Sequence, residues 1–153
     1  MSTLTAGEKA PVFTANDQQG NPVSLQQFTG KKVVLYFYPK DDTPGCTAEA
    51  CDFRDNYQSL TAQDIVVLGV SVDDEKSHQK FITKHSLPFT LLADTDKKIV
   101  EDYGVWVEKN NFGKKYMGIA RKTFLIDEEG VITHIIDKVD TKNATAQVLA
   151  LLK

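Results

Sequence analysis

The chain has little of several features that would define its class. Among its 153 residues there are only two cysteines, Cys46 and Cys51, and only two arginines. Two cysteines without an export signal are typical of a reducing compartment, where thiols are catalytic, sensing or inert. The longest apolar run, Val33 to Tyr38, is far too short to span a bilayer. A disulfide-stapled secreted scaffold and a membrane-spanning protein are therefore not expected.

The N-terminal segment, the net charge and the length set expectations for the compartment, the partners and the number of domains. Residues 1–9 lack the basic and apolar regions of a signal peptide. We therefore expect a cytoplasmic protein, or an organellar one if a transit peptide has been removed. The net charge of −3 argues against nucleic acid or an anionic membrane as the main partner. The length predicts one domain over residues 1–153, large enough to bury a core without disulfides or metal.

Alternating strand and helix patterns predict an α/β fold. We expect strands over 12–15, 22–25, 32–38, 65–72, 90–92, 123–126 and 131–136, an excursion over 105–117, and helices over 46–60, 74–85, 94–103 and 143–152. The first two strands form an N-terminal hairpin. The remainder predicts a central mixed sheet flanked by helices on both faces. Right-handed crossovers place the strands 32–38 and 65–72 side by side in parallel.

Two helices show an apolar stripe at helical spacing. From Cys46 the stripe continues at positions 50, 53, 57 and 60, with Glu49 outside it. In the helix that closes the chain, Ala146, Leu149 and Leu152 are the candidates for the buried side. These stripes predict which side of each helix faces the sheet.

Cys46 follows Thr43-Pro-Gly at the start of a predicted helix. If Thr43 is the N-cap, Pro44 takes the first helical position, where proline is favoured. Cys46 then lies among free backbone N–H groups at the positive end of the helix dipole. Both effects favour the thiolate over the thiol, which makes Cys46 a candidate nucleophile.

The helix alone is too weak to ionise a thiol at neutral pH. An ordinary cysteine is only ~3% thiolate at pH 7, and ~90% ionisation requires roughly 3.4 kcal/mol of extra stabilisation. A helix N-terminus supplies about 0.3–1 kcal/mol, or about 2 in good geometry. We therefore expect a cation beside the sulfur. Arg54 lies about two helical turns away, whereas Arg121 would reach Cys46 if strand 123–126 lies beside strand 32–38; Lys40 is a weaker candidate.

Cys51 follows Cys46 by five residues on the same predicted helix. Helix geometry separates two such Cα atoms by roughly 8–9 Å, whereas a relaxed disulfide needs about 4.4–6.8 Å. The two sulfurs therefore cannot bond on an intact helix, and a bond between them requires the helix to open locally. Cys51 is either a reaction partner of Cys46 or an inert, half-buried thiol.

Several motifs together resemble one family. Pro39-x-x-x-Thr43-x-x-Cys46 matches the signature of the peroxiredoxins, thiol peroxidases built on an elaborated thioredoxin fold. Residues 45–55 resemble the subgroup called bacterioferritin comigratory protein, or Q-type peroxiredoxin, and residues 118–127 resemble the arginine-bearing strand of the family. The resemblance runs from about Gly7 to the C-terminal helix. It implies a thioredoxin-like fold with peroxiredoxin elaborations.

The resemblance also implies an activity, the reduction of hydrogen peroxide and organic hydroperoxides. Cys46 would be the peroxidatic nucleophile, oxidised to a sulfenic acid, and Cys51 the resolving thiol that forms an intramolecular disulfide with it. Pro39 would shield the pocket, Thr43 would hydrogen-bond the peroxide, and Arg121 would stabilise the thiolate and the transition state. Thioredoxin or a similar dithiol reductant would reopen the disulfide. No metal, haem or flavin is required, and the subgroup suggests a monomer.

Other titratable side chains have less specific interpretations. Glu49, one turn after Cys46, either organises the pocket through Arg121 or is an ordinary first-turn carboxylate. His78 and His85 are seven residues apart on a predicted helix, too far for one zinc ion, and we expect them to be surface or partly packed residues.

Two other functions stay open at this point. A disulfide oxidoreductase that acts on proteins would be expected to carry Cys-x-x-Cys, which the chain lacks. A redox sensor would use the oxidation of Cys46 to change its shape, without turnover. Peroxide consumption coupled to a dithiol reductant separates the peroxidase from both alternatives.

Overall fold

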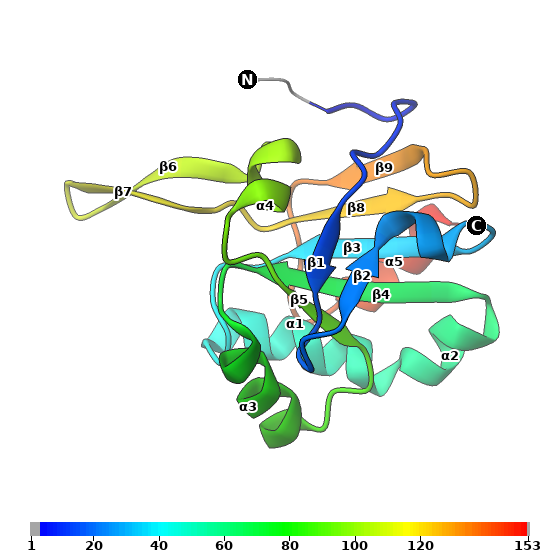
Figure 1. Ribbon diagram of the computed structural model, residues 1–153, viewed down its shortest axis with the longest axis horizontal. Helices are drawn as coiled ribbons and strands as arrows, with labels where there is room; N and C mark the ends of the chain where they lie inside the picture. Colours follow the sequence, from blue (N-terminus) through cyan, green and yellow to red (C-terminus); the bar gives the residue numbers. More distant parts are fainter. Residues whose placement is uncertain (1–3, 153) are drawn as a thin grey trace.

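A mixed seven-stranded sheet forms the centre of the molecule (Figure 1). The structure is a computed structural model and describes residues 4–152. The strands are β1 (Thr14–Asn16), β2 (Pro22–Ser24), β3 (Lys32–Phe37), β4 (Ile65–Ser71), β5 (Thr90–Ala93), β6 (Trp106–Asn111), β7 (Lys114–Ile119), β8 (Lys122–Ile126) and β9 (Ile132–Ile136). The order in the sheet is β2-β1-β5-β4-β3-β8-β9, while β6 and β7 form a separate hairpin that projects from the body.

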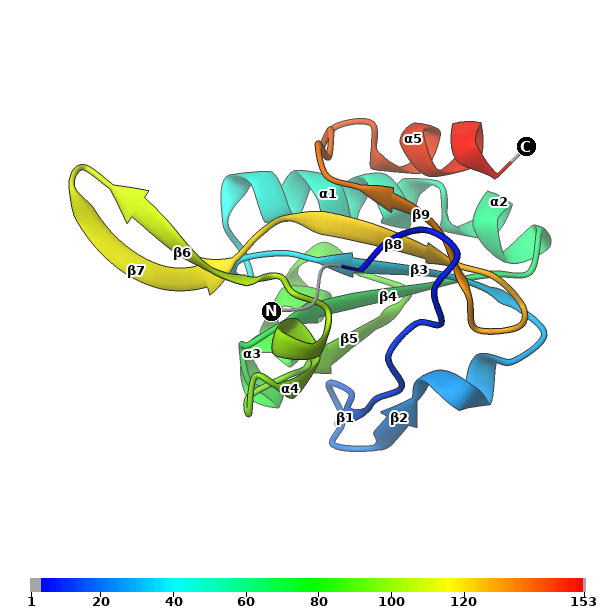
Figure 2. The ribbon, with the colours of Figure 1, turned by 90° about the horizontal axis from the view of Figure 1, so that it is seen from above.

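Helices cover both faces of the sheet (Figure 2). They are η1 (Leu25–Phe28), α1 (Pro44–Asp55), α2 (Tyr57–Ala62), α3 (Glu75–His85), α4 (Lys98–Asp102) and α5 (Ala144–Leu151). On one face, buried side chains of α1, α2, α3 and α5 pack against Val34 and Tyr36 of β3. On the other face, buried side chains of η1 and α4 pack against Leu35 and Phe37. No helix within residues 4–152 combines the length and the apolar character needed to cross a membrane.

The central strand β3 places the parts of the chain that matter for the thiols. It runs parallel to β4 and antiparallel to β8, with Phe37 opposite Lys122. The end of β3 therefore lies beside the start of β8, although the two are far apart in the sequence. The α/β class, the N-terminal hairpin, the parallel pair and the placement of β8 beside β3 are confirmed.

Two helix predictions were wrong in detail. The predicted helix 46–60 is interrupted at Asn56, whose side-chain amide donates to the carbonyl of Asp52 at 2.8 Å, so that α1 ends and α2 begins there. In α5 the fully buried residues are Ala144, Thr145 and Val148; of the three predicted inward residues, Leu149 and Leu152 are partly buried and pack against the same core, whereas Ala146 is exposed. The backbone N–H of Thr145 donates to the Asp52 side chain at 2.8 Å, which joins the start of α5 to α1.

Gly69 of β4 allows the close packing of the layer beneath α1. A Cβ atom at this position would lie 2.8 Å from the hydroxyl of Tyr36 and 2.7 Å from Cδ2 of Leu91. We expect Gly69→Ala to lower the free energy of unfolding by about 1–3 kcal/mol, because neither buried side chain can retreat. Urea denaturation measures this loss. Gly118→Ala is the control, since its nearest neighbour is the flexible side chain of Lys109; equal losses in the two variants would contradict the prediction.

Candidate active site

Cys46 lies at the start of α1, as predicted. Thr43 is the N-cap residue and Pro44 the first helical residue. The first helical hydrogen bond runs from the N–H of Thr47 to the carbonyl of Thr43, at 2.8 Å. The N–H groups of Gly45 and Cys46 therefore have no acceptor within the helix and contribute positive potential around the sulfur.

The Thr43 side chain does not cap the helix. Its hydroxyl donates to the backbone carbonyl of Lys40 at 2.9 Å, which closes the turn between β3 and α1. Pro39 is half-buried at the start of this turn, and Lys40 is exposed. Within the described residues the Lys40 ammonium forms no ion pair or hydrogen bond, so the weaker of the two candidate cations contributes no contact to Cys46.

Arg121 contacts Cys46 directly. Its Nη2 donates to Sγ of Cys46 at 3.2 Å, and its Nη1 donates to Oε1 of Glu49 at 2.8 Å. Arg121 reaches this position because it immediately precedes β8, which pairs with the end of β3. The absence of a side chain at Gly45 leaves room, since a Cβ atom there would lie 3.1 Å from Nη2. The guanidinium thus meets a thiol and a carboxylate one helical turn apart.

Glu49 is buried, contrary to the prediction that it lies outside the inward stripe. It is 0% exposed, and Oε2 is a buried oxygen without a hydrogen-bond partner among residues 4–152. Burial raises the pKa of Glu49 to about 7, because the opposing effect of the Arg121 charge and hydrogen bond is smaller. A carboxyl at position i+3 from Cys46 shares its helix face, and the hydrogen bond from the guanidinium of Arg121 offsets part of the cost of burying it. Its contact with Arg121 matches the first of the two interpretations of Glu49.

Arg121 keeps its charge within this partly buried cluster. Burial by itself lowers the pKa of Arg121, but the sulfur of Cys46 and the carboxylate of Glu49 raise it further, so the net shift is upward. The cation expected beside the sulfur is therefore present at neutral pH. A guanidinium and a helix N-terminus both lie beside the sulfur, and each favours a thiolate over a thiol.

The buried carboxyl of Glu49 gives the protein a specific pH dependence. Because its pKa is raised from 4.5 to about 7 in the folded state, the unfolded chain binds fewer protons between these values. The free energy of unfolding should therefore fall as the pH rises from 4.5 to 7, by as much as about 3 kcal/mol from this group. Urea titrations of wild type and Glu49→Gln across this range test it. A difference between the two proteins that does not vary with pH would contradict the raised pKa.

Cys51 lies further along α1 and is half-buried, and both cysteines are free thiols. Because α1 is continuous through both residues, this is the dithiol form, and a bond between the sulfurs requires the helix to open. Arg54 takes no part at Cys46: its guanidinium donates to Asp55 at 2.9 Å and to the carbonyl of His85 at 2.8 Å. Of the two arginines, Arg121 is the one at the thiol.

His78 is buried, contrary to the prediction of a surface or partly packed residue. It is 0% exposed, and Nδ1 lies 2.7 Å from Oδ2 of Asp41. His85 is half-buried, as predicted. The signal was available in the sequence, because His78 stands three residues before Phe81, the inward residue of α3. A polar residue is expected outside the inward face, but a buried carboxylate partner allows His78 to belong to it.

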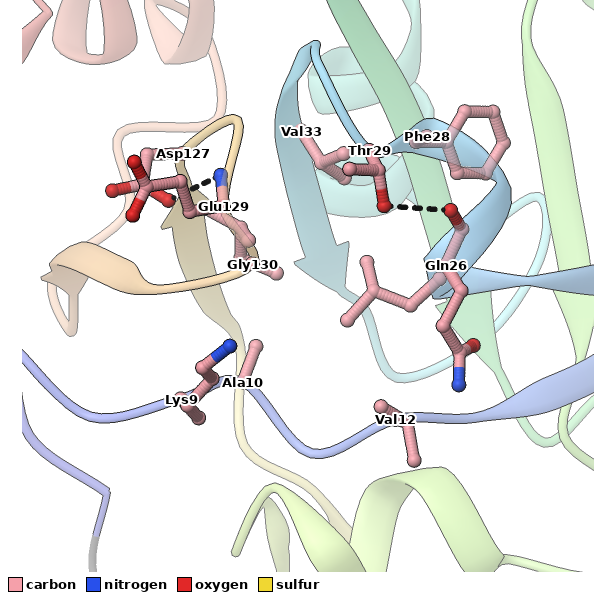
Figure 3. A pocket seen from close by; sticks show the side chains of 12 residues that line it. Lys9, Ala10, Val12, Gln26, Phe28, Thr29, Val33, Asp127, Glu129 and Gly130 are labelled. Carbon is pink, nitrogen blue, oxygen red and sulfur yellow. Dashed lines mark hydrogen bonds between the residues drawn. The ribbon is translucent and has the colours of Figure 1, made fainter.

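A pocket of about 180 Å³ lies at the opposite end of β3 from Cys46 (Figure 3). It is lined by Lys9, Ala10, Val12, Leu25, Gln26, Phe28, Thr29, Val33, Ile126, Asp127, Glu129 and Gly130. None of these is a cysteine, histidine or arginine, and several polar groups bond one another within turns, such as the Thr29 hydroxyl to the Gln26 carbonyl at 2.8 Å. This pocket is therefore separate from the thiol chemistry.

Comparison with known proteins agrees with this geometry. Residues 6–135 match the model of the AhpC/TSA family. The chain is 55% identical over 150 residues to a putative peroxiredoxin Bcp of Coxiella burnetii, covering 98% of this chain and 99% of the relative. It is 50% identical over 151 residues to peroxiredoxin Bcp of Bacillus subtilis, covering 99% and 96%.

A solved structure shows that the similarity extends to the fold. The bacterioferritin comigratory protein of Xanthomonas campestris superposes with a TM-score of 0.88 at 35% identity, covering 97% of this chain and 98% of that chain. The chain that carries this thiol and guanidinium therefore matches these proteins both in fold and in sequence. The chain belongs to the AhpC/TSA family and is a peroxiredoxin of the Bcp, or Q-type, group: a thiol peroxidase that reduces peroxides.

Proposed function

We propose that Cys46 is the peroxidatic nucleophile and Cys51 the resolving thiol of this enzyme. The observation that carries the assignment is the contact of Arg121 Nη2 with Sγ of Cys46, at 3.2 Å, at the N-terminus of α1. Cys51 has no such environment: it lies in the body of the helix and is half-buried. The difference supports Cys46 as the residue of the first chemical step.

In the first step the Cys46 thiolate attacks the terminal oxygen of a hydroperoxide. The O–O bond breaks, the sulfur gains OH and becomes a sulfenic acid, and the departing alkoxide takes up a proton to leave as alcohol, or as water when the substrate is hydrogen peroxide. Arg121 and the free N–H groups at the start of α1 can stabilise the negative charge that moves to the departing oxygen. The Thr43 hydroxyl would hydrogen-bond the peroxide after turning away from the Lys40 carbonyl, and Pro39 would shield the pocket.

In the second step the Cys51 thiol displaces the hydroxyl of the sulfenic acid. An S–S bond forms and water leaves, which requires the first turns of α1 to open. A dithiol reductant then exchanges with the Cys46–Cys51 disulfide, becoming oxidised while both cysteines return to thiols. We propose thioredoxin as this reductant. Glu49 holds the guanidinium of Arg121 in place during the cycle and acts through it.

The substrates we propose are hydrogen peroxide and organic hydroperoxides. The solved Xanthomonas campestris relative is described by its alkyl peroxide reduction activity, which supports the organic class. We further propose a single domain over residues 1–153 that acts as a cytoplasmic monomer. Light scattering during size-exclusion chromatography tests the monomer: a mass near 17.0 kDa is expected, and twice that mass would contradict it.

Cys51→Ser tests the division of roles between the thiols. The variant should consume one equivalent of peroxide per chain at close to the wild-type rate and then stop, because the Cys46 sulfenic acid has no partner. Stopped-flow peroxide consumption and a sulfenic-acid-specific mass label measure this. Continued turnover with thioredoxin would contradict a resolving role for Cys51. Oxidation of the wild type without turnover under any dithiol reductant would instead favour a sensor.

A further inference from the structure

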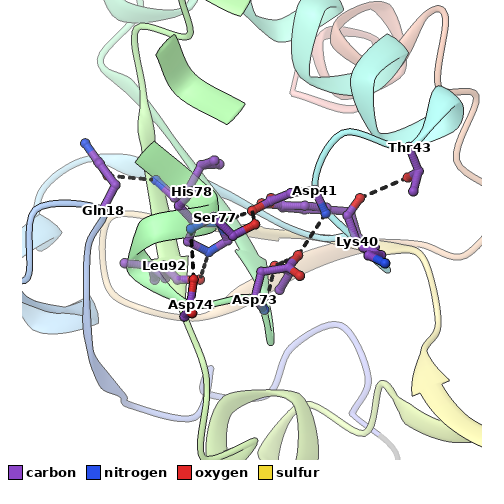
Figure 4. A network of polar contacts seen from close by, with 12 residues as sticks. Gln18, Lys40, Asp41, Thr43, Asp73, Asp74, Ser77, His78 and Leu92 are labelled. Carbon is purple, nitrogen blue, oxygen red and sulfur yellow. Dashed lines mark hydrogen bonds and ion pairs between the residues drawn. The ribbon is translucent and has the colours of Figure 1, made fainter. Parts of the chain in front are cut away.

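The turn that leads into α1 carries a buried carboxylate. Asp41 lies in the turn 39–43, and its side chain is 4% exposed. Oδ1 accepts a hydrogen bond from the hydroxyl of Tyr38 at 2.6 Å. Oδ2 accepts one from the hydroxyl of Ser77 at 2.8 Å and lies 2.7 Å from Nδ1 of His78 (Figure 4). Oδ2 of Asp41 is thus held by two side chains of α3, and Oδ1 by the residue that directly precedes the turn.

The backbone of the same residue is held as well. The N–H of Asp41 donates to Oδ2 of Asp73 at 2.8 Å, and that oxygen also accepts from the hydroxyl of Ser71 at 2.8 Å (Figure 4). Asp73 is the second residue after β4, and its bond to Ser71, the last residue of β4, ties it to the central sheet. The turn 39–43 is therefore attached to β4 by its backbone and to α3 by its side chain.

His78 connects this turn to a third element. Its Nε2 lies 2.9 Å from the carbonyl oxygen of Leu92 in β5. A carbonyl only accepts, so Nε2 carries a proton, while Nδ1 faces the carboxylate of Asp41. Burial by itself lowers the pKa of His78, but the hydrogen bond and charge of Asp41 outweigh it and raise the pKa. Because its two nitrogens contact the Asp41 carboxylate and the Leu92 carbonyl, the ring bridges β5 to the turn.

Such a network is a poor way to gain stability. A buried ion pair loses hydration free energy that its attraction often fails to recover, and an apolar core of the same volume is frequently as stable. A fully bonded polar network does, however, fix one geometry. This network fixes the turn between Pro39 and Thr43. Within the same turn, the hydroxyl of Thr43 donates to the carbonyl of Lys40, the neighbour of Asp41.

We propose that Asp41 and His78 are a positioning pair that holds the turn 39–43 in the geometry in which Pro39 and Thr43 meet the peroxide. The inference rests on the proposed function of Cys46. It places neither Asp41 nor His78 in contact with substrate: both act through the turn. The sulfur itself is held by Arg121, which immediately precedes β8, and does not depend on the pair.

The test compares three variants of α3 histidines. His78→Leu removes both contacts of the ring, whereas His78→Asn keeps an amide donor close to the position of Nδ1. His85→Asn is the matched control: His85 contacts the neighbouring carboxylate, Asp42, at 3.1 Å, but is partly exposed. Stopped-flow measurement of the first oxidation by hydrogen peroxide gives the rate at Cys46. Iodoacetamide alkylation reports on the thiolate without needing a positioned peroxide.

We expect His78→Leu to lower the peroxide rate constant by about 10–100-fold, since a misplacement of about 1 Å can cost that much. His78→Asn should recover most of the loss, and His85→Asn should stay within about threefold of wild type, as for an exposed contact. Alkylation of Cys46 should remain nearly unchanged in all three. An unchanged peroxide rate in His78→Leu would overturn the proposal, as would an alkylation rate that falls in parallel with it. Failure of His78→Asn to recover activity would also overturn it.

Hydrogen exchange tests the same pair without peroxide, so the outcome stays distinct from that of the proposed function. The N–H of Asp41 should exchange slowly in the wild type and at least about tenfold faster in Asp41→Asn, a variant of the same shape in case His78→Leu does not fold. Equal exchange in both proteins would overturn the proposal. If the wild type consumes no peroxide while this amide still responds, the assignment of Cys46 fails and the attachment of the turn stands.

Discussion

Replacing Cys46 by serine is expected to abolish peroxide reduction. A serine hydroxyl is not ionised at neutral pH, and its oxygen cannot be oxidised to the sulfenic acid level. The loss in kcat/KM should be on the order of 10⁴–10⁶-fold, as for removal of other enzymatic nucleophiles. Coupled oxidation of thioredoxin by hydrogen peroxide measures it, because every turnover of the proposed cycle passes through this sulfur.

The structure makes this variant a clean one. Cys46 is fully buried, and serine differs from it by one atom of smaller radius, so the fold should be kept. The serine hydroxyl can still accept the hydrogen bond from Arg121. Cys51→Ser is the matched control in a single-turnover measurement of peroxide consumption, since it removes the other thiol of α1 but should still consume one equivalent of peroxide, whereas Cys46→Ser should consume none. Residual turnover of Cys46→Ser within tenfold of wild type would exclude Cys46 as the nucleophile.

The neighbourhood of Cys46 could be predicted where it depends on the backbone. The apolar run that became β3 had to be a central strand, and the hairpin formed by β8 and β9 supplied its antiparallel neighbour. Arg121 directly precedes β8, so pairing of the two strands was enough to bring it to the end of β3. The start of α1 followed in the same way from Thr43 and Pro44, which are local signals.

The parts that could not be predicted depend on pairs of polar residues from distant segments. From the sequence alone, Glu49 is predicted to be a surface carboxylate, because its partner Arg121 lies 72 residues further along the chain. His78 is likewise predicted to be a surface or partly packed residue, because its partner Asp41 lies 37 residues earlier in the chain. Hydrophobic periodicity assigns a polar residue to the surface, and it fails at a position where a distant partner compensates the burial. Glu49 lies beside the thiol through its contact with Arg121, whereas His78 contacts Asp41 in the turn that leads to the thiol.

For Thr43, too, the backbone position could be predicted and the side-chain contact could not. Its backbone position as the N-cap followed from the sequence, but its hydroxyl donates to Lys40 rather than accepting from the helix. The local reason is Asp42, which has a left-handed backbone with φ of 60° and turns the chain tightly before the helix. Its exposed carboxylate lies 2.7 Å from the Lys84 ammonium. The direction of a hydroxyl therefore depends on a turn conformation that the sequence did not reveal.

The second large effect is expected for Arg121→Ala. The substitution removes a charged hydrogen bond to the sulfur, of about 1.5–3 kcal/mol, and a donor for the departing oxygen. Together these should lower the second-order rate constant with hydrogen peroxide by about 10²–10³-fold. The rate of Cys46 alkylation, plotted against pH, should also reach its plateau at a higher pH. An unchanged alkylation profile would show that Arg121 does not stabilise the thiolate.

Two controls separate charge from geometry in this experiment. Arg54→Ala removes the other arginine, which contacts Asp55 and the His85 carbonyl, and should leave both rates near wild type. Arg121→Lys keeps the charge but loses the planar fork that reaches Cys46 and Glu49 at once. It should recover part of the alkylation profile and little of the peroxide rate. Full recovery of both would mean that charge alone is sufficient.

Glu49 decides how Arg121→Ala affects stability. Without the guanidinium, a buried carboxylate is left without a partner, which costs about 3 kcal/mol when the group is charged. The loss should therefore be larger at pH 8 than at pH 6, since protonation relieves a carboxyl whose pKa burial has already raised to about 7. The double variant Glu49→Gln, Arg121→Ala should recover most of the stability at pH 8 but none of the peroxide rate. Recovery of the rate would mean that the loss in Arg121→Ala came from the stranded carboxylate, and that the thiolate needs no cation beside it.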